Sequence, residues 1–289
     1  MVETNRKPAV TVVLPAFNEA EVVGETVKRI RELHPDFEVL VVDDGSTDST
    51  MQAAMDAGAN VWPHPYNMGN GAAVKSGLRA ARGDYVVLMD ADGQHDPADI
   101  ARLLEQADHF DMVVGARTKA SKTKAHRNLA NGIYNRFASY VTKFKIEDLT
   151  SGFRVMRRST VEQYIYLLPN TFSYPSTITM AYLRSGRSVA YVPIETARRV
   201  GKSKIKLVRD GTRFLLIITK IATLFAPLRI FMPVSLVFFL LGLGYYAFTY
   251  LTQGRFTNMS ALLLNSSVIV FLIGLVSEQV TQLKYERTK

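Results

Sequence analysis

The chain has 289 residues, contains no cysteine and carries a formal net charge of +9. This length accommodates one large α/β domain with an appendage, and the lack of cysteine excludes disulfide bonds and thiolate catalysis. Basic residues cluster between Arg117 and Arg158, where eleven Lys and Arg accompany two acidic residues, and again between Arg198 and Arg213. Such clusters suit anionic lipid headgroups or nucleic acid. Because no helix-turn-helix, zinc-finger or ribonucleoprotein motif accompanies them, we expect no nucleic-acid partner.

The first part of the chain alternates short apolar strands with amphipathic helices. This alternation predicts right-handed crossovers and an α/β domain with a mostly parallel sheet. Farther along the pattern loosens, although further helices and strands are expected. The predicted strands cover residues 10–14, 38–42, 60–62, 84–89, 111–114, 152–157 and 189–192. The predicted helices cover residues 19–33, 47–57, 68–81, 97–106, 124–142, 159–167 and 175–185.

Two long uncharged segments follow, over residues 230–254 and 256–277. Each is long enough to cross a hydrocarbon core of about 30 Å, which needs roughly 20 helical residues. Basic residues precede the first segment and follow the second, whereas the loop between them carries Arg255 alone. By the positive-inside rule, we expect two transmembrane helices, with the N-terminal domain and the C-terminus in the cytoplasm. No apolar, signal-like stretch precedes Pro8.

The expected organisation has four parts, and copies of the chain could associate through the transmembrane helices. Residues 204–224 are amphipathic and predict a helix lying in the membrane interface. The parts are an α/β domain over residues 1–203, interface helices over 204–228, a two-helix transmembrane domain over 229–283 and a cytoplasmic tail over 284–289.

Polar residues are concentrated where three predicted strands end. Ligands of parallel sheets bind beyond the carboxyl ends of the strands, which directs attention to the positions after Leu14, Val42 and Met89. Two carboxylates one residue apart, as in Asp90-Ala91-Asp92, can converge on a hard cation whose shell is completed by nucleotide phosphates. The polar runs are Pro15-Ala16-Phe17-Asn18-Glu19, Asp43-Asp44-Gly45-Ser46 and Asp90-Ala91-Asp92-Gly93-Gln94-His95.

The motifs also permit other roles. Asp43 and Asp44 also suit a turn and a helix N-cap, and one of them could serve there while the other contacts a base or ribose. The segment 69–71 lacks the later glycine of a dinucleotide fingerprint, and no P-loop is present. The histidines His64, His95 and His126 are expected to be structural, and no zinc-ligand cluster is found.

Four segments together resemble the GT-A-fold family 2 glycosyltransferases. They are VTVVLPAFNEA, VVDDGSTDST, NMGNGAAVKSGLRAARGDYVVLMDADGQHDP and SGFRVMRR. The sequence is most similar to the branch of dolichyl-phosphate mannose synthases and polyprenyl-phosphate glucosyltransferases, over roughly residues 8–205. The resemblance implies transfer of a hexose from a nucleotide-sugar, of the GDP-mannose or UDP-glucose type, to a dolichyl or undecaprenyl phosphate. It also implies Mg²⁺ or Mn²⁺ as a cofactor.

The resemblance implies roles for individual residues. The nucleotide-sugar would be contacted by Pro15, Ala16, Asn18, Glu19, Val42, Asp43 or Asp44, Asn67, Gly69, Gly71 and Ala91. The metal and the donor diphosphate would be held by Asp90, Asp92 and Gln94. The acceptor phosphate would be bound by Arg117, Arg127, Ser151, Arg198 and Lys204. Asp90, Asp92 and Arg117 would carry catalysis, with inversion at the anomeric carbon.

Three rival functions were considered. A processive polysaccharide synthase of the same fold is expected to carry a QxxRW motif, but the single tryptophan, Trp62, lies far upstream. A transferase acting on another membrane lipid, such as diacylglycerol, would need a general base, for which Glu147 or Asp148 is the candidate. A membrane-tethered nucleotide-sugar binder without catalytic activity is the third.

Overall fold

The computed structural model describes residues 9–118, 125–170, 173–197 and 223–286. The chain forms two compact units, residues 1–139 with 144–206 and residues 140–143 with 207–289. Most of the predicted interface helix lies outside the described residues, so that helix and the predicted domain boundaries stay predictions.

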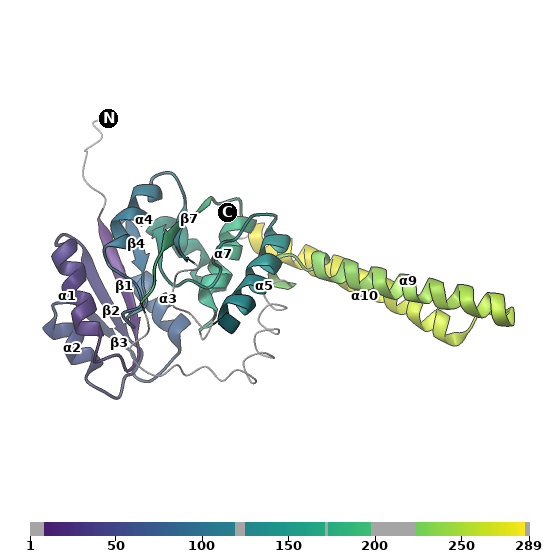
Figure 1. Ribbon diagram of the computed structural model, residues 1–289, viewed down its shortest axis with the longest axis horizontal. Helices are drawn as coiled ribbons and strands as arrows, with labels where there is room; N and C mark the ends of the chain where they lie inside the picture. Colours follow the sequence, from purple (N-terminus) through teal and green to yellow (C-terminus); the bar gives the residue numbers. More distant parts are fainter. Residues whose placement is uncertain (1–8, 119–124, 171–172, 198–222, 287–289) are drawn as a thin grey trace. The chain divides into compact units, whose positions relative to one another are not determined.

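A seven-stranded sheet is the centre of the first unit (Figure 1). Its strand order is β3-β2-β1-β4-β6-β5-β7. The pairs β1–β2, β1–β4, β2–β3 and β5–β7 are parallel, whereas β6 is antiparallel to both of its neighbours. The prediction of a mostly parallel sheet is therefore confirmed. The strands are β1 (Val10–Ala16), β2 (Glu38–Asp43), β3 (Asn60–Pro63), β4 (Tyr85–Leu88), β5 (Met112–Arg117), β6 (Arg154–Arg157) and β7 (Val189–Ile194).

The helices of this part of the chain agree with the prediction in number and place, with two differences. The first helix begins at Val23 instead of Glu19, because residues 18–20 bond to the loop that follows β2. The predicted helix over 159–167 is one α-helical turn followed by a 3-10 helix. The helices are α1 (Val23–Leu33), α2 (Thr50–Asp56), α3 (Asn70–Ala80), α4 (Asp99–Ala107), α5 (Ala125–Thr142), α6 (Arg158–Val161), η1 (Glu162–Leu167) and α7 (Tyr174–Arg184).

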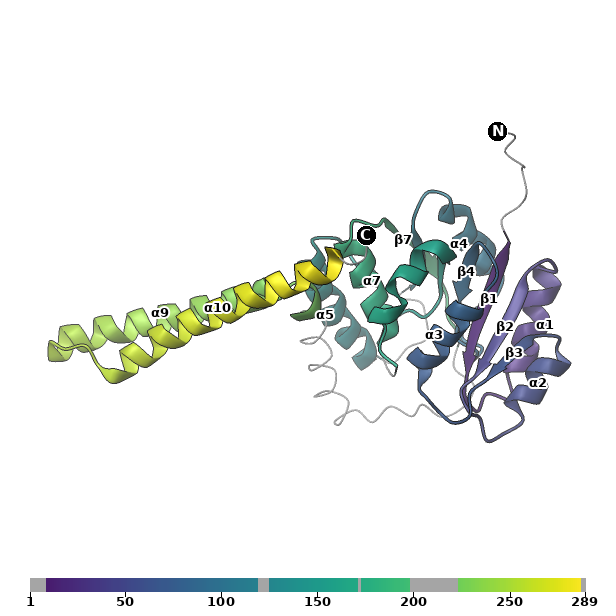
Figure 2. The ribbon, with the colours of Figure 1, turned by 180° about the vertical axis from the view of Figure 1, so that it is seen from behind.

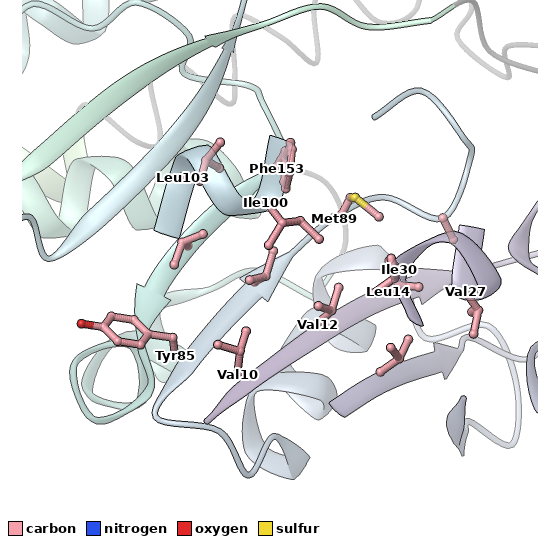
Figure 3. Close-up of a cluster of buried hydrophobic side chains, with 14 of the residues drawn as sticks. Val10, Val12, Leu14, Val27, Ile30, Tyr85, Met89, Ile100, Leu103 and Phe153 are labelled. Carbon is pink, nitrogen blue, oxygen red and sulfur yellow. The ribbon is translucent and has the colours of Figure 1, made fainter. Parts of the chain in front are cut away.

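The main hydrophobic core lies between the sheet and helices α1, α2 and α4 (Figure 3). In α1, Val23, Val27 and Ile30 are spaced three and four residues apart, so they share one buried face. They pack with alternate residues of β1, among them Val12 and Leu14. Each such fully buried side chain contributes roughly 1.5–3 kcal/mol, which fixes the sheet beneath the loops at its carboxyl edge.

The other face of the central strands is covered by α3. Every residue of β1 is buried, as expected for a parallel strand with helices on both faces. Gly77 of α3 lies so close to Val13 that an added Cβ atom would collide with it, and the same Cβ would lie 3.2 Å from Val42. This close packing fixes the position of α3 on the sheet, and the predicted donor loop leads directly into the N-terminus of α3.

The second unit contains a helical hairpin of α9 (Leu228–Gln253) and α10 (Asn258–Glu286), coloured green and yellow in Figure 2. Both helices are long and apolar enough to cross a membrane. Gly254, with φ of 66°, ends α9 in the left-handed conformation that favours glycine. Arg229, at the start of α9, donates to the backbone carbonyls of Tyr140 and Val141 within the same unit.

A row of small residues spaced by seven runs along each of α9 and α10, and we call these two rows the hairpin seam. They are buried, while large apolar side chains on both helices are exposed. The Oγ of Ser235 donates to the carbonyl of Ser267 at 2.9 Å across the seam. A strict repeat of seven produces a left-handed supercoil. The seam residues are Ser235, Gly242 and Thr249 of α9 and Ser260, Ser267, Gly274 and Thr281 of α10.

Candidate active site

The loops that follow β1, β2 and β4 meet at the carboxyl edge of the sheet. These strands are adjacent and parallel, with Ala16 paired to Asp43 and Val13 paired to Leu88. The three polar runs of the sequence are therefore neighbours in space. The predicted location of the site, beyond these strand ends, is where the fold concentrates its polar residues.

The first two loops are joined by hydrogen bonds. The backbone N–H of Asn18 donates to Oγ of Ser46 at 2.9 Å, and Oδ1 of Asn18 accepts from the N–H of Thr47 at 2.8 Å. Asn18 has a φ of 55°, a left-handed conformation that asparagine tolerates better than most residues. The N–H of Glu19 donates to Oγ1 of Thr50 at 2.9 Å. Asn18 and Glu19 thus lie at the junction of the loops predicted to contact the nucleotide.

Three other residues of the predicted nucleotide site are buried in strands. Pro15 and Ala16 belong to β1 and Val42 to β2, and all three are buried. Ala91, between the two aspartates of the third loop, is buried as well. Their side chains are part of the packed sheet and its edge, so any contact with a ligand would come through the backbone.

The two adjacent aspartates after β2 have different environments. The side chain of Asp44 accepts hydrogen bonds from the backbone N–H groups of Met68 and Gly69, each at 2.9 Å, and its Oδ1 lies 2.8 Å from Nδ1 of His64. Asp44 is only 2% exposed. Asp44 therefore holds the loop before α3. Asp43 is also buried, at 6% exposed, but its carboxylate accepts only the N–H of Ser46, at 3.2 Å, among the hydrogen bonds between described residues.

The loop before α3 packs on the turn after β2. Gly45 has a φ of 70°, and a Cβ atom there would collide with the backbone of Tyr66. The next residue, Asn67, is exposed, whereas Gly71 is buried in the first turn of α3. Gly69 adopts a φ of 101°. These glycines allow the predicted donor loop to approach the second loop closely.

The Asp90-Ala91-Asp92 run contains one accessible and one sheltered carboxylate. The side chain of Asp90 is 37% exposed, and Asp92 is buried, with Oδ1 accepting the N–H of Gln94 at 3.2 Å. The backbone of Gly152 lies against Asp90, since a Cβ atom on Gly152 would be 2.6 Å from Oδ2. Gln94 in turn donates from Nε2 to the carbonyl of Ala197 at 3.3 Å.

His95 is a neutral neighbour of these carboxylates. Burial lowers the pKa of His95 to about 4, and this effect outweighs the opposing influence of Asp92. Its Nε2 lies 3.9 Å from Oδ2 of Asp90, so the contact involves no charged imidazole near neutral pH. The ring packs against Phe153 with centroids 5.1 Å apart. These contacts support the structural role predicted for His95.

Arg117, at the end of β5, forms a bidentate ion pair with Asp148. Its Nε and Nη2 donate to the two carboxylate oxygens at 2.7 and 2.8 Å, and Nη2 also donates to Oγ1 of Thr150. The side chains are 18% and 7% exposed. Burial lowers the pKa of Arg117, but the hydrogen bonds and charge of Asp148 together outweigh burial. The pKa of Arg117 therefore lies above its ordinary value. The predicted acceptor-binding arginine is thus fixed in orientation by a carboxylate.

Asp148 is poorly suited to act as a general base. Its carboxylate accepts six hydrogen bonds, from Arg117, Thr150 and the N–H of Ser151. Burial raises its pKa, yet the hydrogen bonds and charge of Arg117 hold that pKa below its ordinary value. Glu147, the other candidate base, is exposed.

The remaining predicted acceptor residues are only partly described. Ser151 is buried, and its Oγ has no hydrogen-bond partner among the described residues. The side chain of Arg127 and all of Arg198 and Lys204 lie outside the described residues. The fold therefore brings together Asp43, Asp90, Asp92, Gln94 and their loops, while these three basic residues stay predictions.

Sequence reasoning missed two residues at this edge, Gly152 and the fully buried Arg154. Both belong to the SGFR segment, in which the sequence predicts a strand over 152–157 and an acceptor contact for Ser151 but no role for Gly152 or Arg154. The available signal was the glycine that follows a serine just before a strand, because a glycine at such a position often marks close approach of another group.

Comparison with known proteins agrees with this architecture. Residues 11–165 match the family described as Glycosyl transferase family 2, and residues 226–283 match the GtrB C-terminal hairpin. An undecaprenyl-phosphate mannosyltransferase of Micrococcus luteus is 31% identical over 211 residues, which cover 68% of this chain and 87% of that protein. Glycosyltransferase AglJ of Haloferax volcanii is 27% identical over 297 residues, which cover 97% of this chain and 96% of that protein.

A solved structure shares the fold. The glucosyl-3-phosphoglycerate synthase of Mycobacterium tuberculosis, in complex with Mn²⁺, UDP and glucosyl-3-phosphoglycerate, superposes with a TM-score of 0.60 at 20% identity, covering 73% of this chain and 78% of that chain. The first unit thus has a GT-A-like α/β fold. Because the family match covers more than half of the sequence and the M. luteus relative is aligned over most of its own length, the chain belongs to glycosyl transferase family 2.

Proposed function

We propose that the protein is a membrane-anchored glycosyltransferase that transfers a sugar from a nucleotide-sugar to a polyprenyl phosphate. The observation that carries this proposal is the meeting of the Asp90-Ala91-Asp92 run with the loops after β1 and β2 at one edge of the sheet. The names of relatives, such as the undecaprenyl-phosphate mannosyltransferase, support the acceptor class.

The residues at this edge fit a divalent cation. Asp90 and Asp92 offer hard oxygen ligands of the kind Mg²⁺ and Mn²⁺ prefer, and Gly152 provides room beside Asp90 that a larger residue would fill. Among the described residues, no group of three or more His, Cys, Asp or Glu could hold a metal by itself. Phosphate oxygens of the donor would therefore complete the shell. When bound, the metal would neutralise the charge that develops on the nucleoside diphosphate.

The acceptor side requires charge compensation and no strong base. A phosphate monoester is ionised near pH 7, so its oxygen is already a nucleophile. In-line attack on the anomeric carbon forms the new sugar–phosphate bond while the bond to the nucleoside diphosphate breaks, which inverts configuration. Arg117 and Ser151 are the described residues suited to orient that phosphate. Asp148 and Thr150 occupy Nε and Nη2 of Arg117, so its Nη1 would donate to the phosphate oxygen in a charge-assisted hydrogen bond.

The hairpin suits a lipid acceptor. Its helices expose large apolar side chains and are long enough to span a hydrocarbon core. We propose that α9 and α10 cross the membrane, with the first unit on the cytoplasmic side, as the distribution of basic residues predicts.

The test is sugar transfer by the detergent-purified full-length protein. It is incubated with Mn²⁺ or Mg²⁺, polyprenyl phosphate and, in turn, radiolabelled GDP-mannose, UDP-glucose, UDP-galactose and UDP-N-acetylglucosamine. We expect label in the organic phase from one donor, only with metal. Asp92→Asn should lower the rate by about 100-fold or more. The control is Asp96→Asn in the same loop, which alters only an exposed ion pair with Arg29 of α1 and should retain activity.

Two outcomes would redirect the proposal. Transfer to diacylglycerol but not to polyprenyl phosphate would refute the acceptor and make Glu147 the base to test, since the hydrogen bonds and charge of Arg117 lower the pKa of Asp148 and make its carboxylate a weak base. Tight binding of a nucleotide-sugar without transfer to either lipid would instead favour a binding protein without catalytic activity.

A further inference from the structure

Arg154 is a buried arginine whose guanidinium has no counter-ion among the residues that the structure describes. It lies on β6 and is 0% exposed. Its Nη1 donates to the carbonyl of Pro175 and to Oγ1 of Thr179, both at 3.1 Å, and its Nη2 donates to the carbonyl of Ser151. Among the described residues no carboxylate lies within 4.0 Å of the guanidinium, and Nε has no hydrogen-bond partner. Burying an unpaired charge is costly, so a compensating role is expected.

The charges that favour the guanidinium include those of the candidate active site. Burial lowers the pKa of Arg154, whereas Tyr174, Tyr191, Asp148 and Asp90 raise it. Arginine nevertheless stays protonated. The positive charge is thus balanced at a distance by carboxylates that serve the site, and by no acidic residue in direct contact among those described.

Residues 151 and 152 together connect Arg154 to both of those carboxylates. The N–H of Ser151 donates to Asp148 at 3.2 Å, and its carbonyl accepts from Arg154. The next residue, Gly152, lies against the carboxylate of Asp90, with only 2.6 Å between its hypothetical Cβ and Oδ2. A change in the orientation of the guanidinium would therefore move the backbone on which Asp90 rests.

We propose that Arg154 is a positioning residue, which fixes the Ser151–Gly152 peptide so that the Asp90 carboxylate keeps its place for the metal-bound donor. This inference rests on the proposed function. Through one rigid planar group, Arg154 donates to four acceptors on three segments. They are the carbonyls of Ser151 and Pro175, Oγ1 of Thr179 and, at 3.7 Å, the sulfur of Met112 on β5. Lysine would keep the charge but cannot donate to the same acceptors in that fixed geometry.

The test compares Arg154→Lys and Arg154→Met with Arg157→Met, which removes a half-exposed arginine from the same strand. Mn²⁺ binding to the full-length protein is measured by electron paramagnetic resonance with UDP or GDP present, together with kcat and the melting temperature. We expect both Arg154 variants to bind Mn²⁺ about tenfold more weakly, because the loss of one hydrogen bond to a charged group costs about that factor. Their kcat should fall by at least the same factor. Arg157→Met should match the wild type.

Other results would overturn the inference. A purely electrostatic role predicts wild-type behaviour for Arg154→Lys and tighter Mn²⁺ binding for Arg154→Met, because a positive charge near the cation is lost. A purely structural role predicts a lower melting temperature with unchanged Mn²⁺ affinity and kcat.

A milder variant covers the case in which neither Arg154 variant folds. Thr179→Val removes one partner of the guanidinium and should weaken Mn²⁺ binding about twofold to threefold; unchanged binding would overturn the inference. If the wild type transfers sugar to no acceptor, the proposed function fails, while Mn²⁺ binding still tests Arg154. A wild type that binds no Mn²⁺ with either nucleotide would overturn the inference as well.

Discussion

Replacing Gly152 by alanine is expected to displace the carboxylate of Asp90 while leaving the protein folded. The added Cβ would lie 2.6 Å from Oδ2 and 3.0 Å from Cγ of Asp90. Ordinary contacts begin near 3.4 Å, so the carboxylate must retreat by about 0.8 Å, the difference between 3.4 and 2.6 Å. A misplacement of about 1 Å at a reacting centre can cost about 100-fold in rate. We therefore expect kcat to fall by roughly 10- to 100-fold.

The assay is sugar transfer measured across a range of Mn²⁺ concentrations, with the melting temperature recorded in parallel. Gly152→Ala should need more Mn²⁺ for half-maximal rate, whereas the melting temperature should change little because the Asp90 side chain is partly exposed and can rotate. The control is Gly132→Ala in α5, where an added Cβ meets nothing within 4 Å. Wild-type kcat and Mn²⁺ dependence in Gly152→Ala would refute the reasoning.

Three further predictions concern packing and charge. Asp148→Asn should lower the free energy of unfolding by about 3 kcal/mol, measured by urea denaturation, since it leaves the largely buried Arg117 without its counter-charge. The pKa of Asp148 in the folded state lies below the ordinary value of 3.8. The ionised carboxylate therefore stabilises the fold above pH 3.8, and this stabilisation is lost as the pH falls through the folded-state pKa. The difference in free energy of unfolding between wild type and Asp148→Asn should shrink over that range. Gly242→Leu should lower the melting temperature of the hairpin in detergent, because a Cβ there already lies 3.1 Å from Leu264, whereas Gly244→Leu, with nothing within 4 Å, should not.

The alternation of strands and helices could be predicted because local apolar runs determine it. The order of strands could not, since β6 enters the sheet between β4 and β5 in the opposite direction, and no local pattern encodes that neighbour relation. The start of α1 was placed four residues too early because Glu19 bonds to Thr50, which is 31 positions away.

The meeting of the three polar runs at one edge of the sheet could be predicted from the sequence, but the contacts that each side chain makes there could not. Asp43 and Asp44 are chemically equivalent in a sequence, and only the contacts of Asp44 with the loop before α3 distinguish them. The basic residues between 117 and 158 predict, as a group, a surface that attracts anionic lipid headgroups. Arg154 and Arg117 are instead buried and partly buried in that stretch, because their partners come from distant positions.

The seven-residue spacing of the hairpin seam determines where the last part of the chain can vary. At the seam a residue is limited by volume, because α9 and α10 approach closely there; elsewhere on the hairpin it is limited only by being apolar. A complete substitution scan of α9 and α10 should therefore show intolerance to size that recurs every seven residues. A hydropathy profile cannot reveal this constraint, since glycine, serine and threonine at the seam are less apolar than the leucine, valine and phenylalanine around them and would nevertheless be the harder to replace by a larger residue.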